Sequence, residues 1–136
     1  MNEPLFTRLL WSLVIIAGAF LLIRLTLWWM LNRARNTAQH SSAIEPGRPT
    51  VIYFTTPDCV PCRTIQRPAL QKALSQLGET FQLIEVNAYE KPELARQWGV
   101  LSIPTTFVLD STGKPRHVNF GVAPAEKLIQ QLKDLL

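Results

Sequence analysis

The sequence predicts an α/β fold with a mixed four-stranded sheet flanked by helices, preceded by one transmembrane helix. Two observations support this prediction. Residues 5–31 are almost wholly apolar, and residues 50–136 alternate between strand-like and helix-like stretches in the order β-α-β-α-β-β-α. We therefore divide the chain into a short N-terminal tail, a transmembrane helix, a polar tether and an α/β domain, at residues 1–8, 9–31, 32–49 and 50–136.

The apolar segment is long enough to span a bilayer. A membrane-spanning helix needs about 20 mainly apolar residues, and residues 9–31 exceed that length. Arg24 lies near the end of the segment, where its long side chain can reach the headgroups. Trp11 and Trp28 lie near the two ends, where indole rings prefer the membrane interfaces. A cleaved signal peptide is the alternative, but no small-residue cleavage site follows the apolar run, so we expect a retained anchor.

The basic residues are concentrated beside this apolar segment. The net charge is +4, and most of the excess comes from arginines in residues 1–49, whereas the α/β domain is nearly balanced. A basic excess on the flanks of an apolar segment is poor evidence for nucleic-acid binding, and we predict none. Arg33 and Arg35 closely follow the segment and only Arg8 precedes its core, so the positive-inside rule favours a cytoplasmic domain.

Local patterns define each element of the α/β domain. Residues 50–55 (TVIYFT) are β-branched and aromatic, which is typical of a buried strand. Residues 59–77 carry apolar side chains at helical spacing, and Gly99 is expected to cap a short helix that ends at Trp98. Turn residues at 110–113 separate the last two strands. The remaining elements are strands at 81–86, 105–109 and 115–120 and helices at 90–98 and 124–135.

The two cysteines, Cys59 and Cys62, lie at the junction between the first strand and the first helix of the domain. At a helix N-terminus, unpaired N–H groups and the helix dipole favour a thiolate, so Cys59 is the expected nucleophile. Cys62 lies one helical turn further on, close enough for a disulfide, and is the expected resolving thiol. Val60 and Pro61 separate them, and Pro61 falls in the first turn, where its missing N–H costs no hydrogen bond. This arrangement suits thiol–disulfide exchange through a mixed disulfide.

Two other interpretations of the cysteines are weaker. A zinc site needs about four ligands, and the remaining candidates, His40 in the tether and His117 in a late strand, lack ligand-like spacing, so no metal is predicted. A purely structural disulfide between cysteines so close in sequence would close too small a loop to stabilise the fold much. Redox chemistry is therefore the favoured interpretation.

Residues 50–136 resemble a thioredoxin domain. The resemblance rests on the strand VIYFTTPD, the CVPC motif that follows it, and the later stretch NAYEKPELARQWGVLSIPTTFVLDSTGK. With the apolar segment, the chain is similar to membrane-anchored thioredoxin-like proteins. The resemblance implies that Pro104 follows a cis peptide bond and lies beside the cysteines. It also implies that Ile103, Pro104 and Thr105 form a substrate groove, in which the backbone of Ile103 pairs with an extended segment.

The sequence departs from the thioredoxin pattern around the cysteines. Asp58 stands where thioredoxins usually have tryptophan, and a carboxylate there should oppose thiolate formation at Cys59. Tyr53 occupies the position of the family's usual buried aspartate, and Glu85 that of a usual lysine. We hypothesise that Glu85 supplies the carboxylate that Tyr53 cannot; the alternative is a surface charge on an edge strand. The helix-kinking proline, Pro68, also falls one residue later than usual.

The resemblance implies a membrane-tethered thiol–disulfide oxidoreductase. The CVPC motif, with proline before the second cysteine, resembles that of the reducing members of the family, so the expected reaction is reduction of protein disulfides. The Cys59–Cys62 pair would be the redox-active disulfide, and no prosthetic cofactor is implied. The expected partners are protein thiol or disulfide clients, an electron-donor dithiol or reductase, and the lipid bilayer through residues 9–31. We expect a monomer.

Two alternative functions and one question of location stay open. The chain could be a non-catalytic thioredoxin-fold docking module, or it could deliver reductant to one dedicated client. Similar bacterial proteins, anchored by a single pass in the inner or plasma membrane, more often face the extracytoplasmic side. Weighed against the positive-inside rule, this leaves a slight preference for a cytoplasmic domain.

Overall fold

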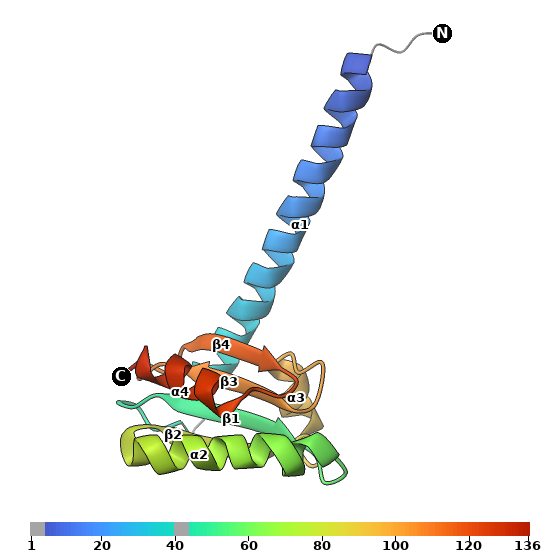
Figure 1. Ribbon diagram of the computed structural model, residues 1–136. Coiled ribbons are helices and arrows are strands. Elements are labelled where there is room, and N and C mark those ends of the chain that lie inside the picture. Colours follow the sequence, from blue (N-terminus) through green and yellow to red (C-terminus); the bar gives the residue numbers. More distant parts are fainter. Residues whose placement is uncertain (1–4, 40–43) are drawn as a thin grey trace. The chain divides into compact units, whose positions relative to one another are not determined.

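The computed structural model describes residues 5–39 and 44–136 of the chain (Figure 1). These residues form two compact units, divided between Asn32 and Arg33. Residues 1–4 of the predicted tail and residues 40–43 of the predicted tether, including His40, lie outside the described residues.

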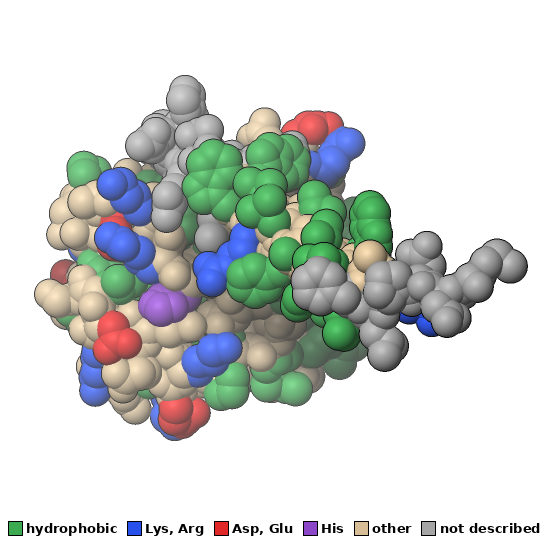
Figure 2. Space-filling view, turned by 90° about the horizontal axis from the view of Figure 1, so that it is seen from above, with side chains coloured by type: hydrophobic (Ala, Val, Ile, Leu, Met, Phe, Trp, Pro, Cys, Tyr) green, Lys and Arg blue, Asp and Glu red, His purple; other side chains and the backbone are tan. Residues whose placement is uncertain are grey.

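A single long helix, α1 (Leu5–Gln39), contains the apolar segment. It begins inside the predicted tail and continues into the predicted tether, because residues 32–39 (NRARNTAQ) contain no proline or glycine and include several strong helix formers. From Thr7 to Trp29 the helix is long and apolar enough to cross a membrane, and its side chains there form a mainly hydrophobic, unburied surface (Figure 2). The same length and composition also fit a signal sequence.

The domain is built on a mixed four-stranded sheet, as the sequence predicts. Its strands are β1 (Thr50–Thr55), β2 (Gln82–Asn87), β3 (Thr105–Leu109) and β4 (Pro115–Phe120), in the order β2-β1-β3-β4. β1 runs parallel to β2 and antiparallel to β3, and β4 is antiparallel to β3. β1 is therefore internal to the sheet, and all of its residues are buried. The bounds of β1, β3 and β4 match the predicted strands, and β2 lies one residue later than predicted.

Helices cover both faces of the sheet (Figure 1). α2 (Arg67–Leu77) and α4 (Ala125–Lys133) pack with each other on one face, and α3 (Pro92–Gln97) covers the other. A short 3-10 turn, Gly78–Thr80, leads from α2 towards β2. The predicted helices at 90–98 and 124–135 are confirmed in slightly shorter form, as is usual at helix ends.

The predicted helix at 59–77 differs from the observed structure in its first turns. Residues Cys62–Gln66 form a π-helical turn, in which the N–H of Arg67 donates to the carbonyl of Cys62, five residues back. Pro68 has no N–H and cannot donate the next bond of a regular α-helix. Since a π turn holds one more residue than an α turn, it accommodates a proline that lies one residue later than the family pattern places it.

The sheet separates two hydrophobic cores. The cysteine-side core lies between the sheet, α2 and α4, and consists of Val51, Tyr53, Cys62, Ala69, Leu70, Ala73, Phe81, Val108, Ala123, Ala125, Leu128, Ile129 and Leu132. The aromatic core lies between the sheet and α3, and consists of Ile52, Phe54, Val86, Ala95, Trp98, Phe107 and Leu109. Alternation along β1 produces this division, because successive residues of a strand point to opposite faces.

The end of α3 is fixed by Gly99, as predicted. Gly99 has a φ of 70°, in the left-handed region that favours glycine. Its N–H donates to the carbonyl of Arg96 at 3.1 Å, and the N–H of Val100 donates to the carbonyl of Ala95 at 3.0 Å. These two bonds close the helix and turn the chain into the loop that precedes β3.

The predicted turn at 110–113 joins β3 and β4 around Asp110. The carboxylate accepts hydrogen bonds from the N–H and hydroxyl of Thr112, from the N–H of Lys114 and from Nε of Arg116. Burial opposes ionisation of this carboxyl, but the hydrogen bonds outweigh burial and lower the pKa of Asp110 to about 2. Asp110 is therefore charged at neutral pH and holds the turn together.

Candidate active site

The two cysteines lie just beyond the end of β1 and are joined by a disulfide of 1.98 Å between the sulfur atoms. A turn through the exposed Pro57 and Asp58 leads to Cys59, whose N–H donates to the carbonyl of Thr56 at 3.2 Å. Cys62 is 1% exposed, whereas Cys59 is only partly buried. This asymmetry is the one expected of an accessible nucleophile and a shielded resolving thiol.

The first helical turn supplies a hydrogen-bond donor to the Cys59 sulfur. Val60 and Pro61 are helical, and the N–H of Cys62 donates to Sγ of Cys59 at 3.2 Å. A backbone N–H that points at sulfur stabilises the thiolate once the disulfide is reduced. Pro61 has no N–H to leave unpaired in this turn, and Val60 is exposed beside the disulfide.

Tyr53 reaches the cysteine turn from within β1. Its side chain is buried, and its hydroxyl donates to the carbonyl of Cys62 at 3.3 Å. Burial raises the pKa of Tyr53 above 10.0; a hydrogen bond with Thr55 lowers it in part, and the charge of Glu85 raises it. The phenol is therefore neutral at neutral pH, and it acts on the backbone of Cys62 as a hydrogen-bond donor.

Glu85 lies on the edge strand β2, in register with Tyr53 of β1. Its side chain is 45% exposed and forms an ion pair with Arg67, at 2.7 Å between Oε1 and Nη2. Arg67 in turn donates its backbone N–H to the carbonyl of Cys62. Glu85 therefore lies at the exposed edge of the sheet and is connected through Arg67 to the contact between Tyr53 and Cys62, so its role in deprotonating Cys62 stays a hypothesis.

The peptide bond between Ile103 and Pro104 is cis, the geometry that the resemblance implies. Because β3 runs antiparallel to β1, its first residue, Thr105, lies beside Phe54 near the end of β1. The cis-proline and the cysteines are therefore at the same end of the sheet. Thr105 is buried, and its hydroxyl donates to the carbonyl of Ser102 at 2.6 Å, which ties the loop to the start of β3.

Sequence reasoning misses one residue of this region, Gln66, which ends the π turn and is completely buried. Its Oε1 accepts a hydrogen bond from the N–H of Ala123 at 2.8 Å, and its Nε2 donates to the carbonyl of Ala123 at 3.2 Å. A polar amide on the buried helical stripe that continues at Ala69 and Leu70 is the signal that could have identified it.

Exposed hydrophobic side chains accompany this end of the sheet. Val60 lies in the motif, Leu101 precedes the cis-proline, Phe120 ends β4, and Val122 follows it. Phe120 is in register with Thr105, so the end of β4 lies beside the cis-proline loop. These exposed apolar side chains therefore lie at the same end of the sheet as the partly exposed Cys59.

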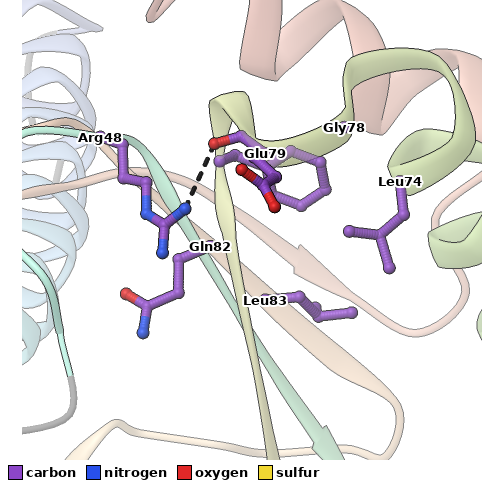
Figure 3. A pocket seen from close by; sticks show the side chains of 7 residues that line it. Arg48, Leu74, Gly78, Glu79, Gln82 and Leu83 are labelled. Atoms are coloured by element: carbon purple, nitrogen blue, oxygen red, sulfur yellow. Dashed lines mark hydrogen bonds between the residues drawn. The ribbon is translucent and has the colours of Figure 1, made fainter.

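A separate pocket opens at the other end of the sheet (Figure 3). Arg48, which precedes β1, donates there to the carbonyl of Glu79 at 3.2 Å. The cysteines follow the opposite end of β1, so this pocket is distinct from the disulfide. The remaining lining residues of the pocket are Leu74, Gly78, Phe81, Gln82 and Leu83.

Across the residues that the structure describes, no group of three or more His, Cys, Asp or Glu side chains could hold a metal ion.

The strand order, the disulfide at the first helix of the domain and the cis-proline at the same end of the sheet define a disulfide protein of the thioredoxin fold. The family model described as Thioredoxin matches residues 33–134, which is most of the chain. The chain belongs to the thioredoxin family.

Individual proteins agree with this assignment. The chain is 32% identical over 99 residues to a thioredoxin of Alicyclobacillus acidocaldarius, across 73% of this chain and 92% of the relative. It is 34% identical over 86 residues to a thioredoxin-like protein of Synechocystis, across 63% of this chain and 80% of that protein. The crystal structure of oxidized mitochondrial thioredoxin 3 from Saccharomyces cerevisiae is similar with a TM-score of 0.58 over 77% of this chain and 90% of the yeast chain. Its 23% identity supports the fold alone.

Family membership and the cysteine geometry together define the activity in general terms. The protein is a thiol–disulfide oxidoreductase that uses a CxxC motif. Proteins of this family exchange electrons with thiol or disulfide clients and with reductants through mixed disulfides.

Proposed function

We propose that the protein is a membrane-tethered reductase of protein disulfides. The observation that carries this proposal is the asymmetry of the cysteine pair, in which Cys59 is partly exposed and Cys62 is buried. A bulky client disulfide can meet only the exposed sulfur, and the buried one is held close enough to complete the exchange.

The reaction transfers two electrons from the dithiol form of the protein to the client. The Cys59 thiolate attacks one client sulfur, forms a mixed disulfide and releases the other client sulfur as a thiolate. The Cys62 thiolate then attacks the Cys59 sulfur, which releases the second client thiolate and forms the Cys59–Cys62 disulfide. The protons given up by the two cysteines end on the two client thiols. A partner dithiol or reductase returns two electrons, and no prosthetic group takes part.

The cis-proline loop is the proposed binding site for the client segment. Ile103, Pro104 and Thr105 lie at the same end of the sheet as the disulfide, and Ile103 packs against both cores. The backbone of Ile103 would pair with an extended client strand, as strand-addition recognition requires. Exposed apolar side chains near both the motif and this loop support the placement.

The apolar stretch Thr7–Trp29 of α1 supports the proposed anchor. In this proposal a monomeric protein crosses a bacterial inner or plasma membrane once, with the domain on the cytoplasmic side because Arg33 and Arg35 follow the apolar stretch. C-terminal fusions test the topology: fluorescence of a GFP fusion supports the cytoplasmic side, and activity of an alkaline phosphatase fusion contradicts it.

Trapping tests the catalytic proposal in the full-length protein. Cys62→Ser should accumulate a mixed disulfide through Cys59, and the wild-type protein should accelerate reduction of insulin by dithiothreitol. Cys59→Ser is the matched control and should trap nothing. No trapped partner together with no insulin reduction would contradict the proposal and favour a docking module. Capture of one protein without insulin reduction would instead indicate delivery of reductant to a dedicated client.

A further inference from the structure

The π turn that follows the first helical residues is held at both of its ends. At its start, the carbonyl of Cys62 accepts hydrogen bonds from the hydroxyl of Tyr53 and from the N–H of Arg67. At its end, the side-chain amide of Gln66 pairs with both the N–H and the carbonyl of Ala123. The first contact joins the turn to β1, and the second joins it to the loop between β4 and α4.

The loop that Gln66 contacts is itself tied to the cis-proline. Gly121, two residues before Ala123, donates its N–H to the carbonyl of Pro104 at 2.8 Å. A continuous series of short contacts therefore runs from Cys62 along the π turn to Gln66, across to Ala123, and from Gly121 to Pro104. In the cysteine-side core, Cys62 and Ala123 are buried together, and Ile103 packs against this core.

The placement of Gln66 follows from the π turn. Five residues fill the turn from Cys62 to Gln66, and Pro68 prevents the regular α-helical bond that would otherwise form there. The resulting register buries the Gln66 side chain and leaves Arg67 at the surface, where it meets Glu85. A buried amide whose two polar atoms both have partners is expensive to misplace, so it fixes the distance between the elements it joins.

We propose that Gln66 is a positioning residue that sets the spacing between the cysteine pair and the cis-proline loop, and so determines how well an extended peptide is held against Cys59. The inference deepens the proposed function, since it rests on a peptide client that binds between these two elements. Val60 on the cysteine side and Val122 on the loop side are exposed, so both borders of the proposed site offer apolar contacts.

A purely structural role makes a different prediction from a positioning role. Loss of a structural amide would lower stability and affect all reactions of Cys59 equally. Loss of a positioning amide should selectively weaken the reaction with a substrate long enough to contact both the cysteine turn and the loop. The chain offers a matched control, because Gln131 and Asn119 form a second amide pair between α4 and β4, at 2.9 and 3.2 Å.

The test compares two activated disulfides with the reduced full-length protein in detergent. One is free cysteine carrying a thionitrobenzoate leaving group, and the other is a short extended peptide whose single cysteine carries the same group. The measured quantity is the second-order rate constant for the peptide divided by that for free cysteine. In this ratio the thiolate fraction and the intrinsic reactivity of Cys59 cancel. For Gln66→Met this ratio should fall by roughly fivefold, because the loss of about one net hydrogen bond that holds the loop in place changes a rate by that factor. For Gln131→Met it should stay at the wild-type value.

A second variant keeps the test decisive if Gln66→Met fails to fold, as judged by circular dichroism. Gln66→Asn keeps a neutral amide but is one methylene shorter, so it cannot make both hydrogen bonds to Ala123 at the present spacing, and the ratio should again fall. An unchanged ratio in the folded variants, or an equal fall in both rate constants, would overturn the inference. A fall of the same size in Gln131→Met would overturn it too. Failure of the wild-type protein to reduce insulin would reject the proposed function without altering this ratio.

Discussion

The two cores on either side of the sheet differ in composition although they share the same strands. In the aromatic core, Phe107 lies 5.0 Å from Trp98 and 5.8 Å from Phe54 between ring centroids, in tilted arrangements that aromatic rings prefer. The cysteine-side core contains the buried Cys62, which forms the disulfide with Cys59, and the hydroxyl of Tyr53.

This difference indicates that residues on one face of the sheet mainly stabilise the fold, whereas residues on the other face also position the cysteines. A close-packed apolar cluster stabilises the fold but has no hydrogen-bonding groups that could position a cysteine. Buried polar groups can position the cysteine backbone and sulfur, although removing them from water costs free energy. Central strand β1 connects the two, because Phe54 lies in one core and Tyr53 in the other. Mutations on the two faces should therefore separate stability from reactivity.

Phe107→Ala should give the largest effect on stability. Removing a buried aromatic side chain costs about 3–5 kcal/mol, because apolar contacts are lost and a cavity remains. Phe107 is on the face away from the cysteines, so the rate of Cys59 alkylation in the reduced, folded protein should stay near the wild-type value. Chemical denaturation and iodoacetamide kinetics measure the two quantities. A large change in alkylation without loss of stability would show that the faces are not separate.

Asp110→Asn tests stability from the hairpin turn, outside both cores. The folded pKa of about 2 lies below the ordinary value of 3.8, so the carboxylate contributes stability above about pH 4 that is lost as the pH falls towards 2. The shift corresponds to about 2 kcal/mol. The variant should be less stable than wild type by about that amount at pH 7 and nearly equal to it at pH 2. A constant difference between the two pH values would contradict this linkage.

Tyr53→Phe should show the opposite pattern to Phe107→Ala. Only the hydroxyl is removed, and the carbonyl of Cys62 keeps the N–H of Arg67, so the loss of stability should be about 1 kcal/mol. A less firmly held turn should weaken the hydrogen bond from the Cys62 N–H to the Cys59 sulfur, raise the pKa of the Cys59 thiol and slow its alkylation at neutral pH. Alkylation rates across pH measure this shift. A wild-type profile would show that Tyr53 contributes only packing.

Glu85→Gln should give the smallest effect on stability, because the ion pair with Arg67 is half exposed. If Glu85 assists deprotonation of Cys62, the pH profile of Cys62 alkylation should shift in the reduced protein. Glu93→Gln is the control, since Glu93 forms a comparable exposed pair with Arg96 on α3, the helix on the other face. An unshifted profile would leave Glu85 as a surface charge.

Patterns along the sequence were sufficient for most of the sheet. β1 and β3 have the predicted bounds because their β-branched and aromatic runs end at turn residues or proline, and β4 has them because the turn at 110–113 marks where it begins. The end of α3 at Gly99 was also predictable, because glycine adopts the positive φ that ends a helix with little strain.

The π turn and the contacts of Gln66 could not be predicted in the same way. Over a single turn, apolar periodicity does not distinguish an α-helical hydrogen bond to the carbonyl four residues back from a π-helical one to the carbonyl five residues back. The partner of Gln66 is Ala123, far away in sequence and recognised through its backbone, so the identity of residue 123 carries no signal. The neighbours of Glu85 depend on strand register, which follows from tertiary pairing and not from local pattern.

The position of Glu85 on an edge strand has a consequence that does not depend on redox chemistry. β2 reads QLIEVN, and Glu85 is its one charged residue, set between Ile84 and Val86 on an outer strand of the sheet. An uncharged apolar edge is a template for pairing with the same strand of another molecule, and a charge there discourages such association. Replacing Glu85 would therefore expose the protein to aggregation, most of all if an anchor concentrates many copies on one surface.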